Sequence, residues 1–126
     1  MNDQTWRILL AEDSFDDVQL VTKILTHYGI EVHHAANGVE CLAMLFDLAP
    51  DLVITDLAMP EMDGWQTLQN IRADARTEDL PVIAIIAYHS TTVAEDAQSA
   101  GFNAYFSKPI SPTTFVQSLR DLLLVG

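Results

Sequence analysis

Short apolar runs of strand length recur along the chain. They cover residues 8–11, 32–35, 52–55, 82–86 and 104–106. The first, third and fourth of these runs are continuously apolar and rich in β-branched side chains. This pattern is typical of strands that are buried on both faces of a parallel sheet. We therefore expect five strands, with these three at the centre of the sheet.

Between the runs, apolar residues are spaced three and four positions apart, as on the buried face of an amphipathic helix. Two such stripes consist of Val18, Val21, Ile24, Leu25 and Tyr28, and of Phe115, Leu119, Leu122 and Leu123. Favoured residues stand at the expected helix starts, namely Ser14, Asn37, Asp63 and the pair Ser111-Pro112. Residues 14–17 resemble a capping box, and we interpret Asp16 and Asp17 as an acidic pair at a helix start. Gly29 and Gly101 mark two helix ends.

The alternation of strands and helices predicts the fold. Five repeats of strand and helix imply right-handed crossovers and an α/β, doubly wound parallel sheet of the flavodoxin type, with strand order 2-1-3-4-5. The 126 residues are 49% hydrophobic, which is enough to build the core of one domain without disulfides. We expect a single domain over residues 1–126, with no linker and no output domain.

Charge and targeting signals narrow the class of protein. Six basic and eighteen acidic residues give a formal net charge of −12, which repels nucleic acid and anionic membranes. The amino terminus has no signal-peptide pattern and no apolar run approaches a membrane span, so we expect a soluble, cytoplasmic protein. The only cysteine, Cys41, lies in an apolar helix stripe and is interpreted as a core thiol.

Charged residues follow three of the predicted strands. Glu12-Asp13 follows the first strand, Asp56 the third, and Lys108 the fifth. In doubly wound sheets ligands bind beyond the carboxyl ends of the strands, so these four side chains are expected to share one cleft. Three clustered carboxylates repel one another unless a cation neutralises them, and Mg²⁺, with Mn²⁺ as an alternative, fits this oxygen-only set. A carboxylate beside such an ion is a candidate nucleophile for phosphorus, and Lys108 would neutralise phosphoryl charge.

Several segments together resemble the motifs of response-regulator receiver domains of the CheY-like type. These are Glu12-Asp13, residues 56–64, residues 81–87 and Lys108-Pro109, and the similarity spans nearly the whole chain. The resemblance implies that Asp56 is the phosphoacceptor and that Asp13, Asp56 and the backbone oxygen of Ala58 bind the metal, with Glu12 holding a metal-bound water. It implies that Lys108 contacts the phosphate and that a cis peptide precedes Pro109. It also implies phosphorelay signalling, with a sensor histidine kinase or phosphotransfer protein as donor, and not a turnover enzyme.

One position departs from the family. Receiver domains carry threonine or serine at the end of the fourth strand, where this chain has Ile86. Isoleucine cannot donate a hydrogen bond to phosphate, and such a neutral bond is worth about 0.5–1.5 kcal/mol. We expect phosphorylation to survive while the conformational response weakens. Ile86, Ala87, Tyr105 and Pro109 therefore form an altered switch region, in which Tyr105 is either a half-buried strand aromatic or the side chain that rotates in related receivers.

Output is expected through a downstream protein partner, unless the sequence is part of a longer chain, and a homodimer is a further possibility. The expected surface is the face of the fourth helix, fifth strand and fifth helix, around Val93, Ala97, Tyr105 and Phe115. A second hypothesis is a phosphorylation-independent pseudo-receiver, with Ile86 marking a lost switch. An aspartate-nucleophile phosphatase is disfavoured because Ala58 stands where that class needs a second aspartate. A flavin carrier is disfavoured because Glu12-Asp13 would repel the flavin phosphate.

Overall fold

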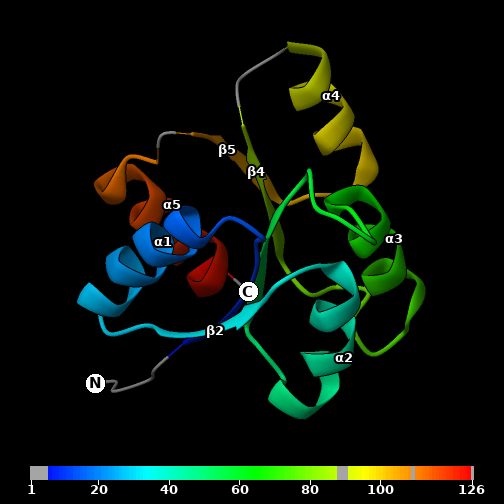
Figure 1. Ribbon diagram of the computed structural model, residues 1–126, viewed down its shortest axis with the longest axis horizontal. Helices are drawn as coiled ribbons and strands as arrows, with labels where there is room; N and C mark the ends of the chain where they lie inside the picture. Colours follow the sequence, from blue (N-terminus) through cyan, green and yellow to red (C-terminus); the bar gives the residue numbers. More distant parts are fainter. Residues whose placement is uncertain (1–5, 88–90, 109, 126) are drawn as a thin grey trace.

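The computed structural model describes residues 6–87, 91–108 and 110–125. Strands and helices alternate from one end of this region to the other (Figure 1). The elements are β1 (Arg7–Ala11), α1 (Phe15–His27), β2 (Glu31–Ala35), α2 (Gly38–Leu48), β3 (Leu52–Asp56), α3 (Gly64–Ala73), β4 (Val82–Ile86), α4 (Thr91–Ala100), β5 (Ala104–Ser107) and α5 (Pro112–Val125). The predicted alternation is confirmed.

The five strands form one parallel sheet in the order β2-β1-β3-β4-β5. This confirms the predicted fold class and strand order. Strands β3 and β4 are buried along their whole length, and β1 is buried beyond Arg7. The edge strands β2 and β5 are only partly buried, because each has a neighbour on one side alone.

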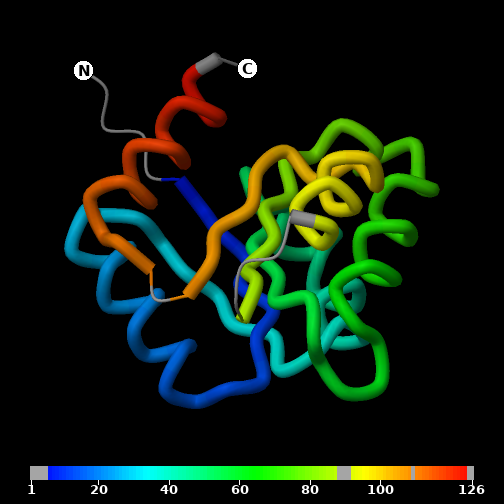
Figure 2. Tube along the Cα trace, turned by 90° about the horizontal axis from the view of Figure 1, so that it is seen from above, coloured from blue at the N-terminus to red at the C-terminus, as the bar shows by residue number. Residues whose placement is uncertain are grey.

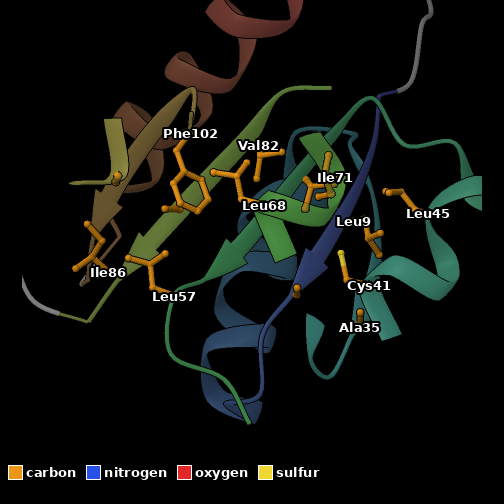
Figure 3. Close-up of a cluster of buried hydrophobic side chains, with 14 residues drawn as sticks. Leu9, Ala35, Cys41, Leu45, Leu57, Leu68, Ile71, Val82, Ile86 and Phe102 are labelled. Atoms are coloured by element: carbon orange, nitrogen blue, oxygen red, sulfur yellow. The ribbon is translucent and has the colours of Figure 1, made fainter. Parts of the chain in front are cut away.

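Helices cover both faces of the sheet. Helices α1 and α5 lie on one face, and α2, α3 and α4 lie on the other (Figures 1 and 2). The first layer packs Leu25 and Phe115 against Leu10, and the second packs Cys41 and Ile71 among buried strand residues (Figure 3). Two separate apolar cores therefore hold the sheet rigid, and its carboxyl edge is a fixed platform.

The helix boundaries follow local signals that the sequence predicted. The side chains of Ser14, Asn37 and Asp63 each accept a hydrogen bond from a backbone N–H three residues ahead, which satisfies a donor that the first turn leaves without a partner. Gly29 and Gly101 have φ values of 77° and 112°, a region where glycine is favoured. No described helix combines the length and the apolar composition needed to cross a membrane.

Three expected placements were wrong. Tyr28 was expected in the buried stripe of α1, but it is 38% exposed because the helix ends at His27, and its ring lies under the Arg120 guanidinium. Ala97 and Phe115 were expected to contribute to the output surface, but both side chains are fully buried against the sheet. Neither can contact a partner in this conformation.

Cys41 lies in the core, as predicted. Its side chain is fully buried in the layer between α2 and the sheet. Burial raises the pKa of the thiol to about 12, because the thiolate would lose its hydration there. The thiol is therefore a packing group and not a nucleophile.

Candidate functional site

The carboxyl ends of β1 and β3 bring three carboxylates together. Glu12 and Asp13 follow β1 directly, and Asp56 is the last residue of β3. One oxygen from each of the three lies within 4.8 Å of the other two. Lys108, which follows β5, places its Nζ atom 3.1 Å from Asp56 Oδ2. The four residues that the sequence singled out thus share one end of the sheet.

The loop after β3 fixes the carboxylate of Asp56. The side chain is almost fully buried, and its Oδ1 atom accepts a hydrogen bond of 3.0 Å from the backbone N–H of Ala58. Leu57 anchors the loop at both sides, since its N–H donates to Ile85 and its carbonyl accepts from Gly64. The two oxygens of Asp56 therefore have different environments, one bound by backbone and the other facing Lys108.

Glu12 is an unusual buried acid. Its side chain is fully buried, and Oε2 accepts a hydrogen bond from the N–H of Ser14. Its Oε1 atom makes no hydrogen bond within the described part of the chain. Burial raises the pKa of Glu12 to about 7. The hydrogen bond from Ser14 acts in the opposite direction and lowers the pKa, while the adjacent Asp56 raises it further. A buried oxygen without a hydrogen bond, beside two more carboxylates, is suited to receive a cation or a cation-bound water.

Lys108 is surrounded by acids. Its Nζ lies 2.6 Å from Asp17 Oδ2, 3.1 Å from Asp56 Oδ2 and 3.6 Å from Glu12 Oε1. Burial alone would lower the pKa of this ammonium, but the hydrogen bonds to Asp17 and Asp56 outweigh it and raise the pKa above its ordinary value. The lysine backbone N–H donates to the carbonyl of Ile86, which ties the end of β5 to β4. Lys108 is thus a fully charged, positioned cation.

Sequence reasoning missed the contact made by Asp17. The residue does lie in the first turn of α1, as predicted, but its carboxylate bonds Lys108. The expected capping box is only half formed, because the N–H of Ser14 donates to Glu12 and not to Asp17. One sequence signal for this contact was available. Asp17 lies four residues after Asp13, at the start of a helix that begins at the same edge of the sheet.

A cavity of about 730 Å³ opens beside Asp56. Its lining includes Asp13, Ala58, Ile86 and Ala87. Ile86 is 4% exposed and packs inward next to Leu57 (Figure 3). The wall of the site near Asp56 is therefore apolar at this position.

The rest of the expected switch region is only partly described. Tyr105 is partly buried and packs against the same core layer as Ile86, and Ala87 is exposed at the cavity rim. Pro109 and the peptide bond before it lie outside the described residues. Ile86 and Tyr105 thus pack in the same core layer.

The donor set fits a hard divalent cation. The carboxylates of Glu12, Asp17 and Asp56 contact the Lys108 ammonium. Those of Glu12, Asp13 and Asp56 converge without any sulfur or imidazole ligand. Mg²⁺ prefers oxygen ligands and keeps several waters, so an exposed Asp13 beside the buried pair suits it. The unsatisfied oxygen of Glu12 is the structural observation that supports this fit.

A doubly wound sheet with this strand order, three acids and a lysine at its carboxyl edge defines a class of signalling protein. The family model of the response regulator receiver domain matches residues 8–120, and the chain belongs to this family. It is 34% identical to an uncharacterised 14.6 kDa protein of Leptolyngbya boryana over 93% of this chain and 89% of that protein. It therefore aligns with a relative of nearly its own length.

Two solved structures show the same fold. The chemotaxis protein CheY4 of Vibrio cholerae is 26% identical with a TM-score of 0.86, and the match covers 94% of this chain and 98% of that one. The receiver domain of a sensor histidine kinase from Pseudomonas aeruginosa is 25% identical with a TM-score of 0.87, covering 95% and 98%. That structure has a magnesium ion coordinated in its active site cleft. The chain is accordingly a CheY-like receiver domain of two-component signalling, a class that binds Mg²⁺ in an acidic pocket and partners with histidine kinases or phosphotransfer proteins.

Proposed function

We propose that Asp56 accepts a phosphoryl group from a histidine kinase or phosphotransfer protein, and that this modification is the signal the chain carries. One observation carries the proposal. Asp56 ends a buried strand with Oδ1 held by the Ala58 N–H, while Oδ2 lies 3.1 Å from the Lys108 ammonium and within the acidic cluster. A carboxylate fixed in this way has its attacking oxygen oriented before a donor arrives.

The transfer uses groups that the site positions. An oxygen of Asp56 forms a bond to phosphorus, the P–N bond of the phosphohistidine breaks, and the imidazole keeps the electron pair and takes a proton. Lys108 neutralises charge on the phosphoryl oxygens. A Mg²⁺ held by Asp13, Asp56 and the backbone oxygen of Ala58, with a water held by Glu12, would supply further charge neutralisation. The same groups would let small phosphodonors such as acetyl phosphate phosphorylate Asp56 without a kinase.

A second candidate function is a phosphorylation-independent interaction module. The burial of Ile86 favours it, because no hydroxyl at that position can sense the phosphoryl group. The retained acids and Lys108 favour the phosphoacceptor, since Glu12 Oε1 is buried without a hydrogen bond and has the Lys108 ammonium 3.6 Å away, which leaves room for a closer cation or a cation-bound water. We therefore place the phosphoacceptor first.

The signal would leave through protein contacts of one cytoplasmic domain. The proposed surface is the face of α4, β5 and α5, where Val93 and Tyr105 remain partly exposed. Ala97 and Phe115 are no longer part of it. A phosphoryl group shifts such a surface only if it contacts two conformations differently, and Ile86 weakens that difference. We propose a partner protein or a second copy of the chain as the receiver of the signal.

Acetyl phosphate tests the proposal. The wild type and Asp56→Asn are incubated with the donor, once with Mg²⁺ and once with EDTA, and their intact masses are compared. The expected result is a phosphate-sized gain only in the wild type with Mg²⁺. Binding of Mg²⁺ without any mass gain in the wild type would favour the interaction module.

A further inference from the structure

The strongest contact of the Lys108 ammonium is not with the proposed phosphoacceptor. Its Nζ lies 2.6 Å from Asp17 Oδ2, compared with 3.1 Å from Asp56 Oδ2. Both side chains of this ion pair are mostly shielded from solvent, with 30% of the Asp17 side chain and 23% of the Lys108 side chain exposed. Charge-assisted hydrogen bonds of this length between partly buried groups hold a lysine far better than exposed ion pairs do. Asp17 is thus the main anchor of Lys108.

Asp17 is itself held by the start of α1. Its N–H donates to Ser14 Oγ, and the N–H of Ser14 donates to Glu12 Oε2. The first turn of α1 is therefore linked to the acidic cluster by backbone as well as by the Asp17 carboxylate. Asp17 and Lys108 line a second cavity, of about 370 Å³, on the α1 side of the site. The lysine spans from this cavity to Asp56, which lines the larger one.

We propose that Asp17 is a positioning residue for the phosphoryl transfer, holding the Lys108 ammonium beside Asp56 before the donor binds. This proposal rests on the proposed function of Asp56. A lysine side chain is long and flexible, and a second carboxylate that fixes one of its three N–H donors leaves the others directed towards the acceptor. Preorganised donors of this kind need no reorganisation when phosphoryl charge arrives.

The chain supplies a matched control for this role. Asp16 precedes Asp17 in the same helical turn and carries the same charge, but it is exposed and makes no contact with Lys108. Asp16→Asn and Asp17→Asn therefore make the same change in net charge and in the first turn of α1. Only the second removes the anchor of Lys108.

The test compares phosphorylation rates. Wild type, Asp17→Asn, Asp17→Glu and Asp16→Asn are incubated with phosphoramidate and Mg²⁺, and the intact mass is followed with time. We expect Asp17→Asn to be phosphorylated about tenfold more slowly, Asp17→Glu to recover most of the rate, and Asp16→Asn to match the wild type. Mg²⁺ affinity, read from the fluorescence of Trp65 in the larger cavity, should stay within about twofold for all four.

Three results would overturn the proposal. An unchanged or faster rate in Asp17→Asn would show that Asp17 does not position Lys108. An equal loss in Asp16→Asn would assign the effect to helix charge. If Asp17→Glu is folded by circular dichroism but does not recover the rate, the carboxylate at position 17 is not what positions Lys108. If the wild type itself gains no phosphate, the failure belongs to the proposed function of Asp56.

Discussion

At the scale of single residues, Ile86 forms the apolar wall of the site beside Asp56. Its side chain is 4% exposed and forms part of both the second core layer and the cavity beside Asp56. It contributes apolar packing and carries no hydroxyl. The proposal that position 86 weakens the response to phosphorylation can therefore be tested by introducing a hydroxyl there.

Introducing a hydroxyl at position 86 tests this role of the side chain. Ile86→Thr and Ile86→Val have nearly the same shape, and both lose packing, so their difference reports the hydroxyl alone. A phosphate hydrogen bond worth about 0.5–1.5 kcal/mol predicts a phosphorylated fraction roughly two- to tenfold larger, as a ratio to unmodified chain, in Ile86→Thr. Intact mass at one acetyl phosphate concentration measures it. Equal fractions in the two variants would mean that position 86 does not reach the phosphoryl group.

Glu12 gives the resting protein a pH dependence with a defined sign. Its pKa rises from 4.5 to about 7 on folding, so the folded state binds the proton more tightly than the unfolded chain. The contribution to stability is fully present below pH 4.5 and is lost as the pH rises through 7. The shift corresponds to about 3 kcal/mol.

Urea unfolding in EDTA at pH 5 and pH 8 measures this contribution, and Glu12→Gln is the control because it keeps the shape and cannot ionise. We expect the wild type to lose stability between the two pH values by more than Glu12→Gln does. Adding Mg²⁺ at pH 8 should restore stability to the wild type, since a ligand that binds only the folded state stabilises it. Parallel curves for the two proteins would show that Glu12 ionises freely.

The sequence predicted most of the site at this scale, because the residues that follow buried strands are brought to one edge by topology alone. Glu12, Asp13, Asp56 and Lys108 were found in this way. Asp17 was not, since aspartates at helix starts are common and the direction of its carboxylate depends on how α1 packs against the sheet and α5. Its contact with Lys108 joins residues 91 positions apart.

At the scale of elements, the β3–α3 connection decides how Asp56 is presented. A Cβ atom on Gly64 would lie 2.5 Å from the Asp56 carbonyl oxygen and 2.8 Å from Leu57 Cα. Both neighbours are backbone, so they would have to move. Gly64 is therefore required for the close approach of α3 to the strand that carries the acceptor.

Gly64→Ala is expected to destabilise the protein by about 1–3 kcal/mol and to slow phosphorylation, because relieving the clash displaces Asp56. Gly29→Ala is the control. Its Cβ would have no neighbour within 4 Å, and its φ of 77° costs about 1–2 kcal/mol far from the site. Urea unfolding and acetyl phosphate labelling should show that both variants lose stability and only Gly64→Ala loses labelling rate. Unimpaired labelling in Gly64→Ala would contradict the role of this contact.

The limits of the elements were predictable to within a residue or so for the strands. Four strands extend one residue beyond the predicted apolar run, and the added residues are all polar, namely Arg7, Glu31, Asp56 and Ser107. These residues join the sheet through their backbone groups, so a pattern of hydrophobic side chains cannot predict them. Arg7, for example, is paired with Glu31. The end of α2 could not be predicted from a glycine, because the residue that adopts the left-handed conformation there is Ala49, with a φ of 50°.

At the scale of the whole molecule, the alternation of strands and helices predicts a parallel sheet between two helical layers, and the strand order follows from assigning the flavodoxin type of this fold. The exposure of individual residues on the output face could not be predicted in this way. A face defined by α4, β5 and α5 includes helical positions that point inward, which is why Ala97 and Phe115 proved buried. Their neighbours on the same elements, Val93 and Tyr105, are partly exposed.

Phosphorylation of this receiver domain on Asp56 can be located directly. Reduction with borohydride converts an aspartyl phosphate into a stable alcohol, homoserine, which peptide mass mapping can locate. After incubation with acetyl phosphate and Mg²⁺, we expect homoserine at position 56 and at no other acidic residue. A chain that is labelled elsewhere, or that carries no homoserine after the same treatment, would contradict phosphorylation of Asp56.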